Sequence, residues 1–177
     1  MTFKYKIIFL SDFHIGSGLS SGAESDAEVL KDDNNLPYLP GRTIKGLLSA
    51  ALAEIKAVQP KKVNENTFNS IFIKSDSFFS NAEITENENE KSSITAEMSQ
   101  FLYRNIASTA INESGVAKPQ SLRSIEVCIP IVFEGEITNI SNEGAELLEM
   151  ACRWVRNIGM NRNRGLGRCK IERPKLN

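Results

Sequence analysis

An apolar stripe with helical spacing is the feature that most constrains the fold of this chain of 177 residues. Its members recur at i, i+3, i+4, i+7, i+8 and i+11, and they are Ile44, Leu47, Leu48, Ala51, Leu52 and Ile55. They predict a helix that begins at Pro40-Gly41 and buries one face against a sheet or another helix. Residues Phe3 to Leu10 alternate apolar and polar side chains, which predicts a half-buried first strand.

The rest of the chain is predicted to add further strands and a second helix. The strands are expected at Phe68 to Ile84, at Ile125 to Phe133 and at Arg168 to Arg173. The helix is expected from about Glu143 to Ile158, with Gly159 at its C-cap. This order predicts an α+β fold, with both helices on one face of the sheet and an RRM-like or ferredoxin-like core. Phe72, Phe78 and Phe79 are predicted core residues.

Three segments are predicted to be inserted into this single domain of residues 1–177. The loop at about 16–36 is long, poor in large apolar residues and rich in Ser, Gly and acid, which is typical of functional or disordered loops. Residues 85–99 are acidic and Asn-rich, which predicts a mobile insertion. The turn signal Asn112-Glu113-Ser114-Gly115 predicts a protruding hairpin over about 106–123.

The composition excludes several classes of protein. The three cysteines, Cys128, Cys152 and Cys169, are odd in number and form no CxxC pair, which argues against a disulfide framework and a zinc site. A single histidine excludes His-rich metal sites. The sequence shows neither a secretory signal nor an apolar run long enough to cross a bilayer, so we expect a cytoplasmic protein without a membrane partner.

The net charge of −1 hides a strong polarity along the chain. Residues 1–152 carry a net charge of −8 and residues 153–177 one of +7. A basic segment of this density can bind phosphates, although charge runs are more often solvated faces.

Two basic features point to a bound phosphate. Arg42 and Lys45 lie at the start of the first predicted helix, where the macrodipole disfavours cations and favours anions. The alternative is that both side chains extend into water. The second feature is the loop Asn161-Arg162-Asn163-Arg164-Gly165-Leu166-Gly167-Arg168, in which glycine permits close approach and arginine matches phosphate oxygens. The helix dipole accounts for Arg153 and Arg156 but not for the cations after Gly159.

Acidic residues and a histidine are further candidates for chemistry. The loop that contains Asp26, Glu28, Asp32 and Asp33 could hold Mg²⁺, since hard cations take carboxylate ligands, but its composition favours solvated acid. His14 follows the first strand in Ser11 to Gly18 and could act as a general acid or base, although a lone histidine is more often structural.

Four blocks together resemble the RAMP superfamily, in particular the repeated backbone subunit of type III CRISPR interference complexes. They are residues 10–18, residues 36–46 with the pattern Pro-Gly-x-x-x-Lys-Gly, residues 110–126, and Arg164-Gly165-Leu166-Gly167-Arg168. The resemblance implies an RRM-like core with a β-hairpin thumb. It also implies copies stacked in a filament along a guide RNA (crRNA), with other effector subunits as partners, and regular cleavage of paired target RNA.

The resemblance also implies roles for single residues. Asp26 matches the aspartate needed for cleavage that depends on Mg²⁺ or another divalent cation, with Asp32 as a weaker contender. The expected RNA contacts are His14, Arg42, Thr43, Lys45, Lys118, Arg123, Arg162, Arg164, Gly165 and Gly167. The thumb has Asn112-Glu113 where the family usually has Asp-Arg, which removes one charge contact.

Two other functions share this core and stay open at this point. One is a purely structural RNA-binding subunit of the same filament, in which Asp26 is inert. The other is a guide-processing RAMP endoribonuclease that uses His14 as its general acid or base.

Overall fold

The computed structural model describes residues 1–18, 26–74, 76–84, 94 and 96–174. Its main sheet is antiparallel, with the strand order β2-β6-β1-β7 and with β3 also paired to β6. The strands are β1 (Phe3–Phe9), β2 (Phe78–Phe79), β3 (Glu83–Ile84), β6 (Val132–Thr138) and β7 (Cys169–Glu172). The predicted first strand therefore lies inside the sheet, paired with β6 on one edge and β7 on the other.

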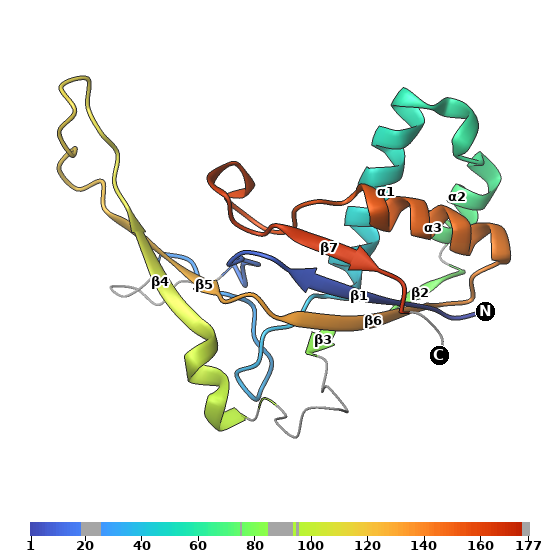
Figure 1. Ribbon diagram of the computed structural model, residues 1–177, viewed down its shortest axis with the longest axis horizontal. Helices are drawn as coiled ribbons and strands as arrows, with labels where there is room; N and C mark the ends of the chain where they lie inside the picture. Colours follow the sequence, from blue (N-terminus) through green and yellow to red (C-terminus); the bar gives the residue numbers. More distant parts are fainter. Residues whose placement is uncertain (19–25, 75, 85–93, 95, 175–177) are drawn as a thin grey trace.

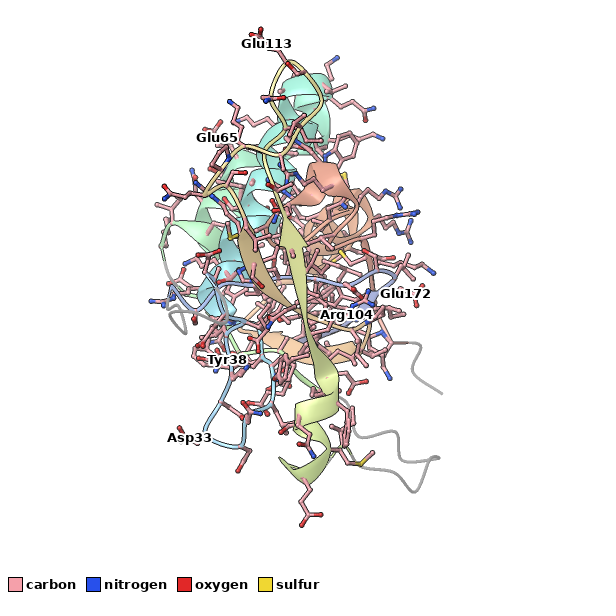
Figure 2. All side chains as sticks on the ribbon, turned by 90° about the vertical axis from the view of Figure 1, so that its left-hand side faces the viewer. Asp33, Tyr38, Glu65, Arg104, Glu113 and Glu172 are labelled. Atoms are coloured by element: carbon pink, nitrogen blue, oxygen red, sulfur yellow. The ribbon has the colours of Figure 1, made fainter. Side chains whose placement is uncertain are left out.

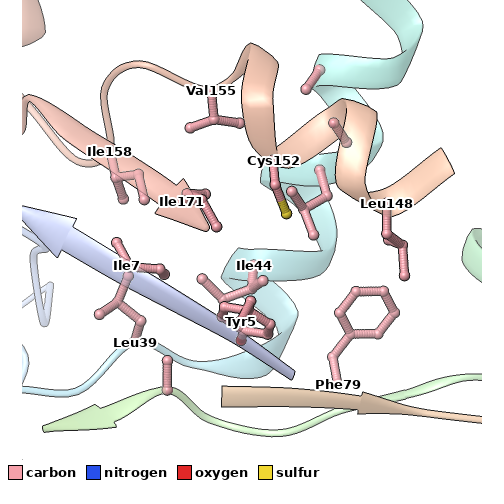
Figure 3. Packing of buried hydrophobic residues seen from close by; sticks show 14 of the residues in the cluster. Tyr5, Ile7, Leu39, Ile44, Phe79, Leu148, Cys152, Val155, Ile158 and Ile171 are labelled. Carbon is pink, nitrogen blue, oxygen red and sulfur yellow. The ribbon is translucent and has the colours of Figure 1, made fainter. Parts of the chain in front are cut away.

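The helices cover one face of this sheet (Figure 1). They are α1 (Gly41–Val58), α2 (Glu65–Phe72) and α3 (Asn142–Trp154), with short 3-10 turns η1 (Pro60–Lys62), η2 (Ala96–Leu102) and η3 (Arg162–Arg164). Figure 3 shows Ile44 of α1 and Cys152 of α3 packed over Tyr5 and Ile7 of β1. The stripe on α1 thus meets both the sheet and a second helix, and the prediction of an α+β fold with helices on one face is confirmed.

A second, two-stranded sheet projects from this core (Figure 1). It consists of β4 (Tyr103–Ser108) and β5 (Arg123–Cys128), paired antiparallel from Tyr103 opposite Cys128 to Ser108 opposite Arg123. Figure 2 shows Glu113 at the far tip of this hairpin and Arg104 closer to the body of the molecule. The hairpin is longer than the predicted 106–123, because its strands begin at Tyr103 and end at Cys128.

Several predicted elements are wrong in detail. Of the strand region predicted at 68–84, only β2 and β3 are strands, and residues 68–72 belong to α2. Asn64 caps this helix, in which Phe68 and Phe72 lie one turn apart with ring centroids separated by 5.0 Å. Phe78 is 65% exposed and so is not a core residue. The predicted strand 125–133 is divided between the two sheets, as β5 and β6.

The other differences concern the second helix and the insertions. α3 ends at Trp154, and Gly159 lies beyond its cap with φ +97°. Of the predicted mobile insertion 85–99, residues 85–93 and 95 lie outside the described residues, whereas residues 96–102 form η2.

The three cysteines are buried and form no disulfide with one another. Burial raises the pKa of the Cys128, Cys152 and Cys169 thiols to about 12, so they are not reactive thiolates at neutral pH. Over the described part of the chain, no helix has the length and apolar character needed to cross a bilayer.

Candidate functional site

The segment that follows β1 joins the main sheet to the hairpin. Phe13 forms two backbone hydrogen bonds with Cys128 of β5, of 2.9 and 2.8 Å. The Arg104 guanidinium of β4 donates from Nε to Oδ2 of Asp12 at 2.7 Å, and the Asp12 side chain is only 11% exposed. These bonds fix the base of the hairpin against the end of β1.

His14 lies in the interior of this segment. Its side chain is 1% exposed, and Nδ1 donates to the Glu126 carbonyl oxygen at 2.6 Å. Within the described residues, Nε2 is buried without a hydrogen-bond partner. The sequence left open a functional and a structural role for His14, and the buried ring that joins the loop to β5 favours the structural one.

The glycine-rich loop is held on the same segment through its backbone. Gly167 N donates to Asp12 O at 2.7 Å, and Ser11 Oγ donates to Gly165 O at 2.9 Å. A Cβ on Gly159 would lie 2.3 Å from His14 O, so glycine permits this close approach. The loop thus keeps its backbone against the protein, while the Arg162 and Arg164 side chains are exposed.

Asp26 is fixed beside the base of the hairpin. Asp26 N donates to Ser124 O at 2.8 Å, and the Asp26 Oδ2 atom accepts a hydrogen bond of 2.8 Å from Ser124 N. Ala27 then forms a parallel bridge with Ile125. Asp26 and Ala27 therefore pair with β5, and Val29 then bridges to Gly16, so these residues of the loop predicted at about 16–36 are bonded on two sides.

These parts enclose a groove of about 760 Å³ at the base of the hairpin. Asp26, Arg123 and Arg164 line it, and they come from three segments that lie far apart in the sequence. The remaining lining combines apolar and hydroxyl or amide side chains, among them Ile106, Ser108, Gln120, Met160 and Asn161. The groove therefore brings one predicted carboxylate and two predicted phosphate-binding cations into a single cavity.

The predicted cations at the start of α1 lie elsewhere. Arg42 and Thr43 are exposed, and Arg42 lines a different cavity of about 780 Å³ with Lys4, Glu134 and Glu136. Lys45 Nζ lies 5.9 Å from the centroid of the Phe79 ring. The first turn of α1 holds no acid, and its N-cap is Pro40 without a side-chain hydrogen bond. Gly41 N donates to Asn81 Oδ1 at 3.0 Å, and the start of α1 does not share the groove with Arg164.

The other predicted site residues are distributed over the surface. Lys118 is exposed in the outer part of the hairpin and does not line the groove. Arg162 lines a small groove beside Trp154 and Glu54, on the helical side of the molecule. Asp32 accepts hydrogen bonds from Asn34 N and Leu36 N, which makes it a turn residue and the weaker of the two aspartate candidates.

The face of the sheet opposite the helices has a mixed charge. In β1, β6 and β7 the register places these residues on it: Lys4, Lys6, Ile8, Val132, Glu134, Glu136, Thr138, Lys170 and Glu172. Lys6 pairs with Glu134, and Lys170 pairs with Glu172. None of these residues of β1, β6 and β7 is aromatic, so these strands do not offer the stacking platform with which RRM sheets bind bases.

Three residues that hold or line the groove were not among the predicted site residues: Arg104, Glu126 and Met160. Glu126 lies in the predicted strand 125–133 and in the block 110–126, but the strand pattern does not indicate that its carboxylate binds Val29 N and Lys31. Arg104 and Met160 lie in no motif.

The comparisons with known proteins identify the family and the fold of the chain. The family model of the RAMP superfamily matches residues 6–170. The chain belongs to the RAMP superfamily. The predicted resemblance to the superfamily is therefore confirmed, and the sheet with its helices is a RAMP fold.

Two solved structures share the RAMP fold over nearly their whole length. A chain of the type III-B Cmr-beta complex bound to cognate target RNA has a TM-score of 0.73 and 11% identity, and the match covers 97% of this chain and 96% of that one. A chain of the apo type III-B Cmr-beta complex has a TM-score of 0.74 and 13% identity, with 99% and 98% covered. No curated protein matches the sequence.

Proposed function

We propose that this RAMP protein is a backbone subunit of a type III CRISPR effector complex, which binds guide RNA as one copy in a filament and cleaves the paired target RNA through Asp26. The observation that carries this proposal is the groove in which Asp26 lies with Arg123 and Arg164 at the base of the hairpin. The fold shared with chains of the Cmr-beta complexes, one of them bound to target RNA, supports the assignment to such a complex.

Each group in the groove has a chemical task in this proposal. Arg164 and Arg123 offer planar donors that match the oxygens of a phosphodiester. Asp26 presents a carboxylate whose position is fixed by the two hydrogen bonds to Ser124. The hairpin stands beside them as the thumb that separates successive nucleotides.

A divalent cation fits this groove only when RNA completes its coordination. Among the described residues, no three His, Cys, Asp or Glu side chains gather into a metal site. Mg²⁺ commonly takes one or two carboxylates together with phosphate oxygens and waters, so Asp26 would supply the single carboxylate of the protein. The bound cation would neutralise charge on the phosphodiester.

The two alternative functions differ in how they fit the structure. A guide-processing enzyme that uses His14 is disfavoured, because the His14 ring is buried and donates to Glu126. A structural subunit without catalysis also fits the groove, because Asp26 is the only carboxylate that lines it among the described residues.

Replacement of Asp26 tests the catalytic role directly. We expect Asp26→Asn in the assembled complex to lower the rate of target cleavage by about a hundredfold or more, since its loss removes the group that acts on the phosphodiester. The measurement is single-turnover cleavage of labelled target RNA, with guide copurification as the check on assembly. Asp33→Asn is the matched control, because Asp33 is an exposed acid of the neighbouring turn (Figure 2). Unchanged cleavage in Asp26→Asn with intact assembly would identify the non-catalytic subunit.

A further inference from the structure

Beyond the bonds of Asp26 to Ser124, the segment that carries Asp26 is attached to β5 through Glu126. The Glu126 carboxylate accepts a hydrogen bond of 2.9 Å from Val29 N on Oε2 and one of 2.8 Å from Lys31 Nζ on Oε1. Glu126 N donates to Ala27 O at 3.0 Å. The side chain and the backbone of Glu126 thus bind three residues that follow Asp26, which are Ala27, Val29 and Lys31.

Glu126 also joins this segment to the loop after β1. Its carbonyl oxygen accepts the 2.6 Å bond from His14 Nδ1, while Leu30 N donates to Ile15 O at 2.8 Å on the other side of the segment. The Glu126 side chain is 16% exposed, and Lys31 Nζ lies 4.1 Å from the centroid of the Tyr103 ring. A carboxylate that is largely desolvated and bonded on both oxygens is held in one place.

We propose that Glu126 is a positioning residue for target cleavage, which supports the place of Asp26 in the groove by holding Val29 N. This inference rests on the proposed function of Asp26. Glu126 does not line the groove itself, so it acts through the segment that follows Asp26 and not on the RNA. Ser124 holds Asp26 at one end of this segment, and the bond to Glu126 holds Val29 three residues further on. Loss of the Val29 bond would loosen the segment and let the Asp26 carboxylate move relative to Arg123 and Arg164.

Variants of Glu126 separate the reach of the side chain from its charge. Gln keeps an acceptor for Val29 N but places an amide NH2 where an oxygen accepted from Lys31 Nζ, so it removes the charge and the Lys31 bond together. Asp keeps the charge and is one methylene too short to reach Val29 N. We expect Glu126→Gln to cleave target RNA within a few-fold of the wild-type rate. Glu126→Asp and Glu126→Ala should be slower by about tenfold to a hundredfold, since a displacement of about 1 Å costs that much in comparable sites.

The experiment uses the assembled complex with its guide and measures three quantities for each variant. These are the single-turnover cleavage rate, the affinity for target RNA under conditions without cleavage, and the amount of copurified guide. Positioning predicts that only the cleavage rate changes. Glu149→Ala is the matched control, because Glu149 is also paired to a cation, Arg153, but lies on α3.

The outcomes distinguish this inference from the function on which it rests. Cleavage by Glu126→Asp that equals or exceeds that of Glu126→Gln would overturn the positioning role, as would a parallel loss of RNA affinity in the slow variants. If Glu126→Ala does not fold, the order of the Gln and Asp variants still decides. Wild-type cleavage by Asp26→Asn in the same complex would overturn the proposed function instead.

Discussion

Gly167 occupies the tightest position in the glycine-rich loop. Its φ is +71°, and a Cβ at this position would lie 2.0 Å from the carbonyl oxygen of Ile158. Gly165 has a similar φ of +87° but open space around it. The two glycines therefore differ in one physical respect: both favour a left-handed backbone, but only Gly167 is also required by the close approach of another backbone segment.

This difference predicts unequal effects of alanine at the two positions. We expect Gly165→Ala to lower the free energy of unfolding by about 1 kcal/mol, the usual cost of a left-handed backbone for a residue with a Cβ. Gly167→Ala should cost distinctly more, because the backbone of Ile158 must also move. Urea denaturation of the purified chain measures both. Equal losses in the two variants would show that the loop can shift away from Ile158 freely.

At the scale of elements, the hairpin of β4 and β5 is attached to the body only near its base. The backbone bonds of Cys128 to Phe13, the bridge of Ile125 to Ala27 and the Arg104–Asp12 ion pair all lie in the half nearest the main sheet. Residues 109–120 are exposed throughout. Such a hairpin has few buried contacts in its outer half, so its opening there costs little free energy.

Hydrogen exchange of the native chain tests this gradient. We expect the amides of residues 109–122 to exchange about a hundredfold or more faster than those of β1, since exposed backbone bonds open locally. The Cys128 amide, bonded to Phe13 O at 2.8 Å, should be protected like the core. Uniform protection along the hairpin would contradict an outer half that is independent of the body.

The elements also differ in how clearly the sequence pattern predicts them. The strand at 3–9 and the helix at 41–58 were predicted because one face of each is apolar with a clean period. α2 departs from the predicted strand, because the spacing of Phe68, Ile71 and Phe72 and the Asn64 cap are helical. Short apolar runs do not distinguish the two structures by periodicity alone.

The candidate site was predictable only in its parts. The glycine-rich loop and the aspartate were recognisable as motifs, but the groove depends on contacts between residues about a hundred positions apart, such as Asp26 with Ser124 and Asp12 with Arg104. No local pattern encodes such pairs. His14 illustrates the same limit, because its burial follows from the packing of β5 on the loop and not from its neighbours in the sequence.

At the scale of the whole molecule, the fold places cations that form ion pairs on the open sheet and other cations in the groove. The sheet face opposite the helices pairs its lysines with glutamates, so its cations are largely compensated. Arg123 and Arg164 instead line the groove, and no ion pair is found for either within the described residues. A nucleic acid should therefore release its counterions at the groove side and not on the open sheet.

The salt dependence of RNA binding tests this separation. For single-stranded RNA, each phosphate neutralised by the protein contributes about 0.7 to the slope of log affinity against log salt concentration. We expect Arg164→Ala to reduce the slope by about that amount, since in the proposed complex its guanidinium would contact one phosphate. Lys170→Ala removes the same charge from the open sheet and should leave the slope unchanged, because Lys170 is already paired with Glu172. The affinity of the purified chain for an unstructured RNA, titrated at several salt concentrations, gives both slopes. Equal reductions in the two variants would mean that RNA is held by the net charge of the molecule and not by the groove.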